Sequence, residues 1–280
     1  MHENVENGIA AASCALLGIS GVLVNGASAY LILKMKGLQT SFGYLTAFHT
    51  LSNAFLTSAF ILWVAPYSSY TMHENVENGI AAASCAILGI SGVLVNGASA
   101  YLILKMKVLQ TSFGYLTAFH TLSNAFLTSA FFLWVAPCII WDFSGAFGVN
   151  RSIGQMTLVA QCGAYLSMLM LSVNRFVCVF MPIKYTTIFA NRSTILYIIL
   201  SFLASLMYGC IYFDAPCYFI FDHTSLQFTF SDTECGHVLS DYVDYWFSIV
   251  LFTIACVLDM ATLIKIQLAC FHFIMNFRLT

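Results

Sequence analysis

One arginine and one aspartate stand out because each lies within a long apolar stretch of the chain. Arg175 follows Asn174 in the segment LSVNRFVCVFMPIKY (171–185), and Asp259 begins the segment DMATLIKI. An ionised side chain inside a bilayer is costly, and such residues are functional candidates that usually pair with one another. We propose that Asp259 pairs with Arg175, although local contacts of Asp259 are the favoured interpretation. The alternatives are contacts of Asp259 with nearby Ser or Thr side chains or with Lys265, and for Arg175 an anchoring role at the membrane edge.

Four uncharged polar residues also lie inside apolar stretches. They are Asn96 in GVLVNGAS and His120, Ser123 and Asn124 in HTLSNAFL. Polar side chains in lipid usually face neighbouring helices and form hydrogen bonds with them. We therefore expect these residues to hold helices together; for His120, a ligand or ion site is the alternative.

The composition indicates that lipid, not water, surrounds most of this chain. Its 280 residues are 60% hydrophobic and 8% charged, with a mean hydropathy of +0.85, whereas soluble domains carry about 25% charged residues. The net charge of −2 provides no basic surface for nucleic acid. The sequence contains no nucleotide-binding loop, metalloprotease helix, nucleophile elbow or C-x-x-C zinc pattern. We therefore expect no enzyme, no cofactor and no metal site.

Apolar windows of about 20 residues can cross a bilayer as helices, because a helix satisfies its own backbone amides where no water is available. The sequence has seven such windows, and we predict an all-α, polytopic membrane helix bundle. The windows are Ile9–Leu33, Phe42–Val64, Ile80–Leu104, Phe113–Val135, Ile153–Met181, Ile195–Tyr212 and Val243–Ile264.

The basic residues predict which side of the membrane each loop occupies. Cytoplasmic loops carry an excess of Lys and Arg, and placing the N-terminus outside puts nine of the ten basic residues at the cytoplasmic side, leaving Arg151 outside. We therefore expect a multi-pass protein of the plasma membrane with an extracellular N-terminus and a cytoplasmic C-terminus. The nine residues are Lys34, Lys36, Lys105, Lys107, Arg175, Lys184, Arg192, Lys265 and Arg278.

Three cysteines flank loops that this orientation places in an oxidising compartment. A disulfide between Cys235 and either Cys138 or Cys217 is expected, and spacing alone does not decide between them. Asn150 begins an extracellular N-R-S sequon and is a candidate glycosylation site, whereas Asn191 begins a cytoplasmic N-R-S sequon and is expected to carry no glycan.

The outer loop before the last span is acidic. We expect it to be solvated, with a cation site as the alternative. Its acidic and histidine residues are Asp214, Asp222, His223, Asp232, Glu234, His237, Asp241 and Asp244.

The chain contains a nearly perfect internal repeat. Residues 1–66 align with residues 72–137 and differ at three pairs of positions, Leu16/Ile87, Gly37/Val108 and Ile61/Phe132. The repeated unit is a hairpin of two spans, so copying it leaves the topology downstream unchanged. We interpret 1–71 as a duplicate of the first hairpin, expected to pack at the periphery or not at all, and 72–280 as the working domain.

Dispersed motifs carry a resemblance to a known family. The segment around Asn174 and Arg175 resembles the Asp-Arg-Tyr region that closes the third helix of rhodopsin-like G-protein-coupled receptors, with asparagine in place of the acid. More specifically, the chain resembles the nematode serpentine chemoreceptors of class x. The matching stretches are SFGYLTAF (112–119), LWVAP (133–137), NRFVCVFMPIKYTTIF (174–189), FTFSDTEC (228–235) and DMATLIKI (259–266).

The resemblance implies a rhodopsin-like receptor that detects small extracellular ligands for chemosensation and couples to a heterotrimeric G protein. It also implies that Asn96 matches the asparagine of receptor helix one. The residues that the resemblance places toward the G protein are Asn174, Arg175, Phe176, Pro182, Lys184 and Tyr185.

The span count does not correspond to that of the family. Without the duplicate hairpin, five spans remain, and we expect them to be helices one to five of the receptor pattern, with the last two helices absent. A non-signalling product, truncated or mis-joined, is therefore the first alternative function, and a membrane transporter or channel is the second. The ligand is not readable from the sequence.

Overall fold

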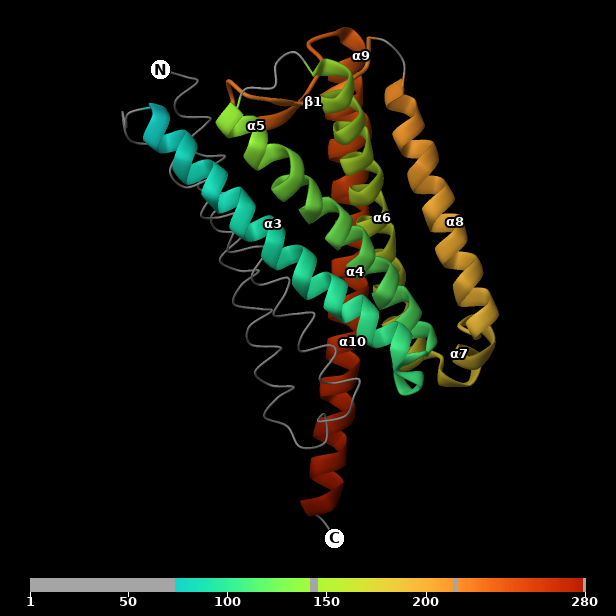
Figure 1. Ribbon diagram of the computed structural model, residues 1–280. Helices are drawn as coiled ribbons and strands as arrows, with labels where there is room; N and C mark the ends of the chain where they lie inside the picture. Colours follow the sequence, from blue (N-terminus) through green and yellow to red (C-terminus); the bar gives the residue numbers. More distant parts are fainter. Residues whose placement is uncertain (1–73, 142–145, 214–215, 279–280) are drawn as a thin grey trace, which may run out of the picture. The chain divides into compact units, whose positions relative to one another are not determined.

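The computed structural model describes residues 74–141, 146–213 and 216–278. The first two predicted spans, and with them the first copy of the repeat, lie outside the described residues. Elements are labelled as in Figure 1, so the first described helix is α3. The α-helices are α3 (Glu74–Lys105), α4 (Ser112–Ala130), α5 (Ala136–Trp141), α6 (Phe147–Phe180), α7 (Pro182–Ile188), α8 (Asn191–Cys210), α9 (Glu234–Val238) and α10 (Trp246–Arg278).

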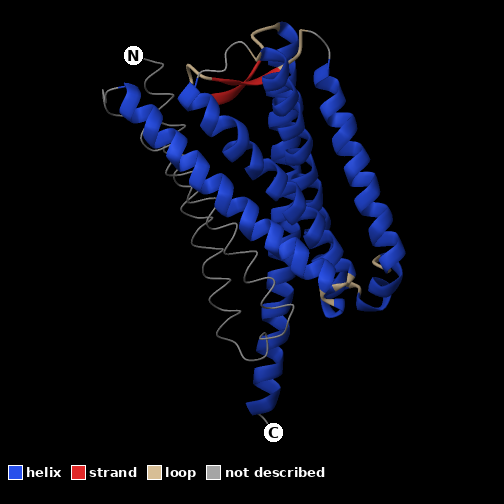
Figure 2. Ribbon diagram, viewed as in Figure 1, coloured by secondary structure: helices blue, strands red, loops and turns tan. Residues whose placement is uncertain are grey.

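The remaining described elements are short. Two are 3-10 turns, η3 (Lys107–Leu109) and η5 (Ile211–Phe213), and two are π-helical stretches, η4 (Phe131–Val135) and η6 (Leu239–Tyr245). Two strands, β1 (Phe219–Asp222) and β2 (Gln227–Phe230), pair as a hairpin, shown red among the blue helices in Figure 2.

Five helical segments of the described chain are long and apolar enough to cross a membrane. Each of them contains most of one predicted window, and the differences lie at the ends. The segments are Asn78–Lys105, Ser112–Trp141, Phe147–Phe180, Asn191–Cys210 and Glu234–Leu268. The predicted fourth window ended at Val135, whereas the helix continues to Trp141. Pro137 has no backbone N–H to donate to the preceding turn, and the π-helical stretch Phe131–Val135 lies immediately before it, as is common where helical hydrogen bonding is perturbed.

The helices have the inverted distribution of residues that lipid favours. Along α8, the buried positions are the small or polar residues Thr194, Ser205 and Gly209, while large side chains such as Ile199 and Leu200 are about half exposed. Small residues at contacts let helices approach closely where no water drives their association. A Cβ on Gly209 would overlap the side chain of Val159 on α6, so this glycine is required for the approach of α8 to α6.

The described chain divides into two compact units. The described residues of the first unit are α3 and η3, the second half of α4, η4, α5, the start of α6 up to Ile153, and residues 221–227. The second unit contains residues 110–123, 154–220 and 228–280. In the first unit α3 lies along η4 and α5 (Figure 1). A Cβ on Gly92 would lie 2.7 Å from Thr128 Cγ2, so a glycine is needed at this crossing.

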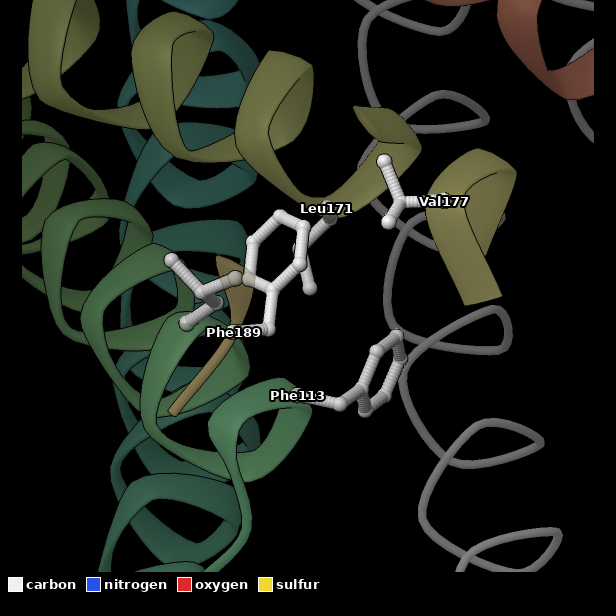
Figure 3. Packing of buried hydrophobic residues seen from close by; sticks show 5 residues of the cluster. Phe113, Leu171, Val177 and Phe189 are labelled. Atoms are coloured by element: carbon white, nitrogen blue, oxygen red, sulfur yellow. The ribbon is translucent and has the colours of Figure 1, made fainter. Parts of the chain in front are cut away.

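The second unit contains two apolar clusters. One cluster joins Phe113 of α4 to Leu171 and Val177 of α6 and to Phe189, which follows α7 (Figure 3). The second gathers around Tyr212, which has no exposed surface, and includes Phe219 of β1 and Leu239 of η6.

The β-hairpin corrects the all-α prediction. Phe219 and Phe221 alternate with less buried residues along β1, as expected for a strand with one packed face, and Leu226 takes φ of 52° in the turn. The sequence reading treated this segment as an acidic loop. It missed the alternation of phenylalanines because the segment has only four residues in each strand.

Candidate functional site

Arg175 and Asp259 form a two-point ion pair within the second unit. Arg175 Nη2 lies 2.8 Å from Asp259 Oδ2 and Arg175 Nε lies 3.1 Å from Asp259 Oδ1. The planar guanidinium matches the two oxygens of a carboxylate in this arrangement. The contact joins the last turns of α6 to α10. Lys265, the alternative partner of Asp259, instead lies over the ring of Phe180 at 5.5 Å.

A buried serine completes this contact. Ser172 has no exposed surface, donates to Asp259 Oδ2 at 3.0 Å and accepts from Arg175 Nη2 at 3.3 Å. Ser172 and Arg175 are three residues apart on α6 and therefore face the same side of the helix. We call Ser172, Arg175 and Asp259 the arginine cluster.

Asn174 faces a different set of partners from Arg175. Its side chain is 2% exposed and lies 3.4 Å from the hydroxyl of Tyr185 on α7, which in turn lies 3.2 Å from Ser112 Oγ at the start of α4. The asparagine therefore connects α6 to α7 and α4 and takes no part in the contact with Asp259. Because consecutive helical residues point in different directions, Arg175 needs its acid from another helix.

The segment after Arg175 presents side chains on the surface. Phe176 stacks on Phe180 with ring centroids 4.3 Å apart, and Pro182 and Lys184 are exposed. Ile183, which the sequence analysis did not single out, is 92% exposed on α7.

The predicted intramembrane polar residues have different surroundings. His120 is buried on α4, with Nδ1 2.9 Å from Ser167 Oγ and 3.1 Å from the carbonyl of Ala164, so it links α4 to α6. Asn96 donates to Gly92 O of its own helix at 2.9 Å, and its Oδ1 has no hydrogen-bond partner within the described part of the chain.

Ser123 and Asn124 are half-buried near the middle of α4. A Cβ on Gly163 of α6 would lie 3.1 Å from Ser123 Oγ. Ser123 therefore lies where α4 and α6 approach each other, whereas the Asn124 carbonyl accepts a hydrogen bond from Thr128 of the same helix at 2.8 Å.

The disulfide joins Cys217 to Cys235, with Cα atoms 5.6 Å apart. It connects the segment that precedes the hairpin to α9, and Thr233 caps α9 by accepting from the Gly236 N–H. Of the two pairings that the sequence left open, this is the one with Cys217. Cys138 is buried in α5.

The side-chain amide of Asn150, the candidate glycosylation site, makes three hydrogen bonds to two residues within the first unit. Its Oδ1 accepts from Trp134 Nε1 at 3.0 Å and from the Phe221 N–H at 2.9 Å, and its Nδ2 donates to the Phe221 carbonyl at 2.8 Å. The side chain therefore docks β1 in the manner of a neighbouring strand.

A second polar cluster lies at the other end of the second unit. Tyr208 of α8 donates to Asp244 Oδ1 of η6 at 2.9 Å, and Tyr212 donates to the Tyr208 hydroxyl at 3.1 Å. Gln155 of α6 donates to the carbonyl of Tyr212. We call Asp244, Tyr208 and Tyr212 the tyrosine cluster. Among the described residues, no group of three or more His, Cys, Asp or Glu is placed to hold a metal ion.

Comparison with known families shows what kind of chain this is. The family described as serpentine type 7TM GPCR chemoreceptor Srx matches residues 16–89 and 86–274. The chain belongs to this family. A comparison with curated protein sequences found no match.

The Srx chain also has the fold of a rhodopsin-like receptor. A crystal structure of squid rhodopsin superposes with a TM-score of 0.60 at 15% sequence identity, over 71% of this chain and 56% of the rhodopsin chain. The Srx chain thus spans little more than half the length of that receptor. It is a multi-pass membrane protein of a receptor family, which is not an enzyme class.

Two features of the Srx chain escaped the sequence analysis. Ser172 gave no signal because serine is common in membrane helices, and its proximity to Asp259 is set by the packing of α6 on α10. Asp244 was counted with the acidic loop, although it is also the second residue of the predicted window Val243–Ile264.

Proposed function

We propose that this chain is a chemosensory receptor of the plasma membrane that detects small extracellular molecules and couples to a heterotrimeric G protein. The observation that carries the proposal is the arginine cluster, because it is a charged contact between two membrane helices at one end of the unit. We place the N-terminus outside and this cluster at the cytoplasmic side, where Lys184, Arg192 and Lys265 also lie by connectivity. We further propose that residues 72–280 form the receptor domain and that 1–71 duplicate its first hairpin.

The arginine cluster is suited to act as a latch between α6 and α10. Both partners are a little more than one third exposed, at 38% for Arg175 and 37% for Asp259, so solvent screens the pair and its contribution is about 1 kcal/mol. A contact of about 1 kcal/mol shifts a two-state equilibrium roughly fivefold. Such a latch holds the resting state and still yields to the binding energy of a small ligand.

The surface next to the latch supports the choice of partner. Ile183 and Lys184 project from α7 immediately after the arginine helix, which offers an apolar anchor with a positive charge beside it. A partner that binds here would contact the loop that Arg175 adjoins, and release of Arg175 from Asp259 would add a free cation to the same surface.

Basal nucleotide exchange on purified heterotrimeric G protein, measured in membranes that contain the full chain, tests the proposal without a known ligand. Asp259→Asn breaks the latch and is expected to raise basal exchange roughly fivefold. Adding Ile183→Glu to that variant should remove the increase, whereas adding Ile140→Glu, at an exposed isoleucine of α5, should not.

Two controls define the outcomes. Asp241→Asn changes an exposed acid of η6 and should leave exchange unchanged. If neither the wild type nor Asp259→Asn exceeds membranes without the chain, coupling to a G protein is wrong, and the chain is a membrane protein with a receptor fold that does not signal in this way.

A further inference from the structure

The acid of the tyrosine cluster is held by a neutral group. Asp244 Oδ1 accepts the hydroxyl of Tyr208 at 2.9 Å. Tyr208 is fixed in turn by the Tyr212 hydroxyl, and Tyr212 is completely buried against Leu158 and Phe219. The carboxylate therefore has a defined position within the second unit, although only one of its oxygens is engaged.

No cation compensates this carboxylate within the described residues. Arg175 pairs with Asp259, no ion pair between described residues involves Asp244, and Asp244 Oδ2 accepts no hydrogen bond from a described residue. A half-buried carboxylate at the edge of a membrane span carries a large free-energy cost unless a positive charge approaches it. The negative charge of Asp244 therefore has no positive partner among the described residues.

The tyrosine that holds Asp244 is packed against other aromatic rings. Tyr208 stacks on Phe247 with centroids 5.6 Å apart and meets Tyr212 edge to face at 5.5 Å. Ring faces attract cations, and aromatic groups beside a carboxylate are a recurring way of binding ammonium ions. Neutral or anionic compounds gain nothing from such a pair of features.

The backbone at Asp244 is irregular. Asp244 lies one residue before the end of the π-helical stretch Leu239–Tyr245, and π-helical turns are frequent at functional sites. Tyr242 and Tyr245 on the same stretch and Trp246 at the start of α10 are more than half exposed, as expected for an aromatic belt at the membrane–water interface. Asp244 therefore lies at a depth that a molecule dissolved in water can reach.

We propose that Asp244, Tyr208 and Phe247 bind a small organic molecule with a protonated amine, which donates to Asp244 Oδ2 and lies against the ring faces. This inference deepens the proposed receptor function by naming the class of ligand. The ammonium group supplies the positive charge that the described residues do not provide, and Tyr208 keeps the carboxylate in the orientation that receives it.

Thermal unfolding of the full chain in lipid nanodiscs tests the proposal with three probes of similar size and different charge. Phenethylamine should raise the unfolding temperature in a concentration-dependent way, whereas 2-phenylethanol and phenylacetate should not. Asp244→Asn should weaken the phenethylamine effect by at least about tenfold, and Asp241→Asn, an exposed acid on the same stretch, should retain it.

A second variant covers the case in which Asp244→Asn does not fold. Tyr208→Phe keeps the ring and the carboxylate but removes the hydrogen bond, and it should weaken binding of phenethylamine about fivefold. The proposal is overturned if phenethylamine gives no shift, if 2-phenylethanol gives an equal one, or if both variants bind as the wild type does.

The two proposals fail separately. Amine binding with no nucleotide exchange leaves the amine site standing and overturns coupling to a G protein. If Asp259→Asn raises nucleotide exchange but phenethylamine does not change the unfolding temperature, coupling to a G protein stands and the amine site is overturned.

Discussion

Two carboxylates of the second unit, Asp259 and Asp244, differ in what surrounds them. Asp259 on α10 receives two hydrogen bonds from Arg175 and one from Ser172, whereas Asp244 on η6 receives one from a tyrosine. Both lie in the last membrane segment of the described chain. A charge paired within the protein favours a structural state, and a charge left without a cation favours an incoming ligand. We therefore propose a structural role for Asp259, as part of the latch between α6 and α10, and a ligand-binding role for Asp244.

Removal of the disulfide between Cys217 and Cys235 has the largest expected effect on stability, and it should affect the site at Asp244 more than the pair at Asp259. Its sequence separation of 18 residues gives a stabilisation of about 3 kcal/mol by loop-closure entropy. Replacing Cys217 and Cys235 together by serine should lower the free energy of unfolding by that amount and should weaken phenethylamine binding, because the cluster around Tyr212 includes both cysteines. Thermal and denaturant unfolding in nanodiscs measure the change.

The latch should survive the loss of the disulfide. Asp259→Asn is expected to change basal exchange by the same factor with and without the two serines. Cys178→Ser, at an exposed thiol of α6, serves as the control and should unfold as the wild type does. An equal loss of stability in that control would remove the special role of the disulfide.

The sequence predicted the membrane spans better than the contacts between them. The five described spans follow from long apolar windows, and the charges of Arg175 and Asp259 mark them as candidates because an ion in lipid needs compensation. Helix ends were predicted less well: Pro137 lies inside a continuous helix because a π-helical stretch precedes it. The hairpin was missed because each of its strands has only four residues, and the pairing of Cys217 with Cys235 depends on how the loop folds back on itself, which cysteine spacing does not specify.

The same limit applies to the tyrosine cluster. Tyr208 and Asp244 are separated by the hairpin and by α9, and neither is unusual in its local sequence. Their contact requires α8 and η6 to be adjacent. Conversely, Asn174 lies next to Arg175 in the sequence yet faces α7. Residues that are adjacent in the chain therefore have different contacts in the folded protein.

Gly154 provides a test of how the hairpin supports the tyrosine cluster. A Cβ on this residue of α6 would overlap the carbonyl of Phe219 on β1. Gly154→Ala should therefore destabilise the protein by about 2 kcal/mol through overpacking and weaken amine binding, leaving basal exchange unaffected. Unfolding in nanodiscs gives the first quantity and the phenethylamine shift the second.

Gly148 is a matched control six residues earlier on the same helix. Nothing lies within 4 Å of the Cβ that alanine would add there, so Gly148→Ala should be neutral or stabilising by up to about 1 kcal/mol because alanine favours the helix. If the two alanine variants have the same stability, the close approach of β1 to α6 is wrong.

A double-mutant cycle on Arg175 and Asp259 has a smaller expected effect. Arg175→Gln and Asp259→Asn should show a coupling energy of about 1 kcal/mol, since the pair is partly exposed. Asp244→Asn should lower the free energy of unfolding by less than Asp259→Asn does. It leaves no cation without a partner, and the asparagine oxygen can still accept the hydrogen bond from Tyr208. Equal costs at the two acids would contradict the distinction between them, and a coupling energy of zero would remove the latch.

Asp222, in the first unit, offers the smallest effect and tests whether neutral donors alone can hold a carboxylate charged in water. Partial burial raises the pKa of Asp222, but hydrogen bonds from Ser225 and Thr224 outweigh it and lower the pKa below the usual 3.8. Because the folded pKa is lower than the unfolded one, the stabilisation is present above about pH 4 and is lost as the pH falls through the folded value. The difference in unfolding temperature between wild type and Asp222→Asn should therefore shrink below pH 4. Ser225→Ala removes the side-chain donor 2.6 Å from Oδ2, so in that background the difference in unfolding temperature that Asp222→Asn causes should be smaller at neutral pH. A difference in unfolding temperature that does not depend on pH would show that these hydrogen bonds do not favour the ionised form.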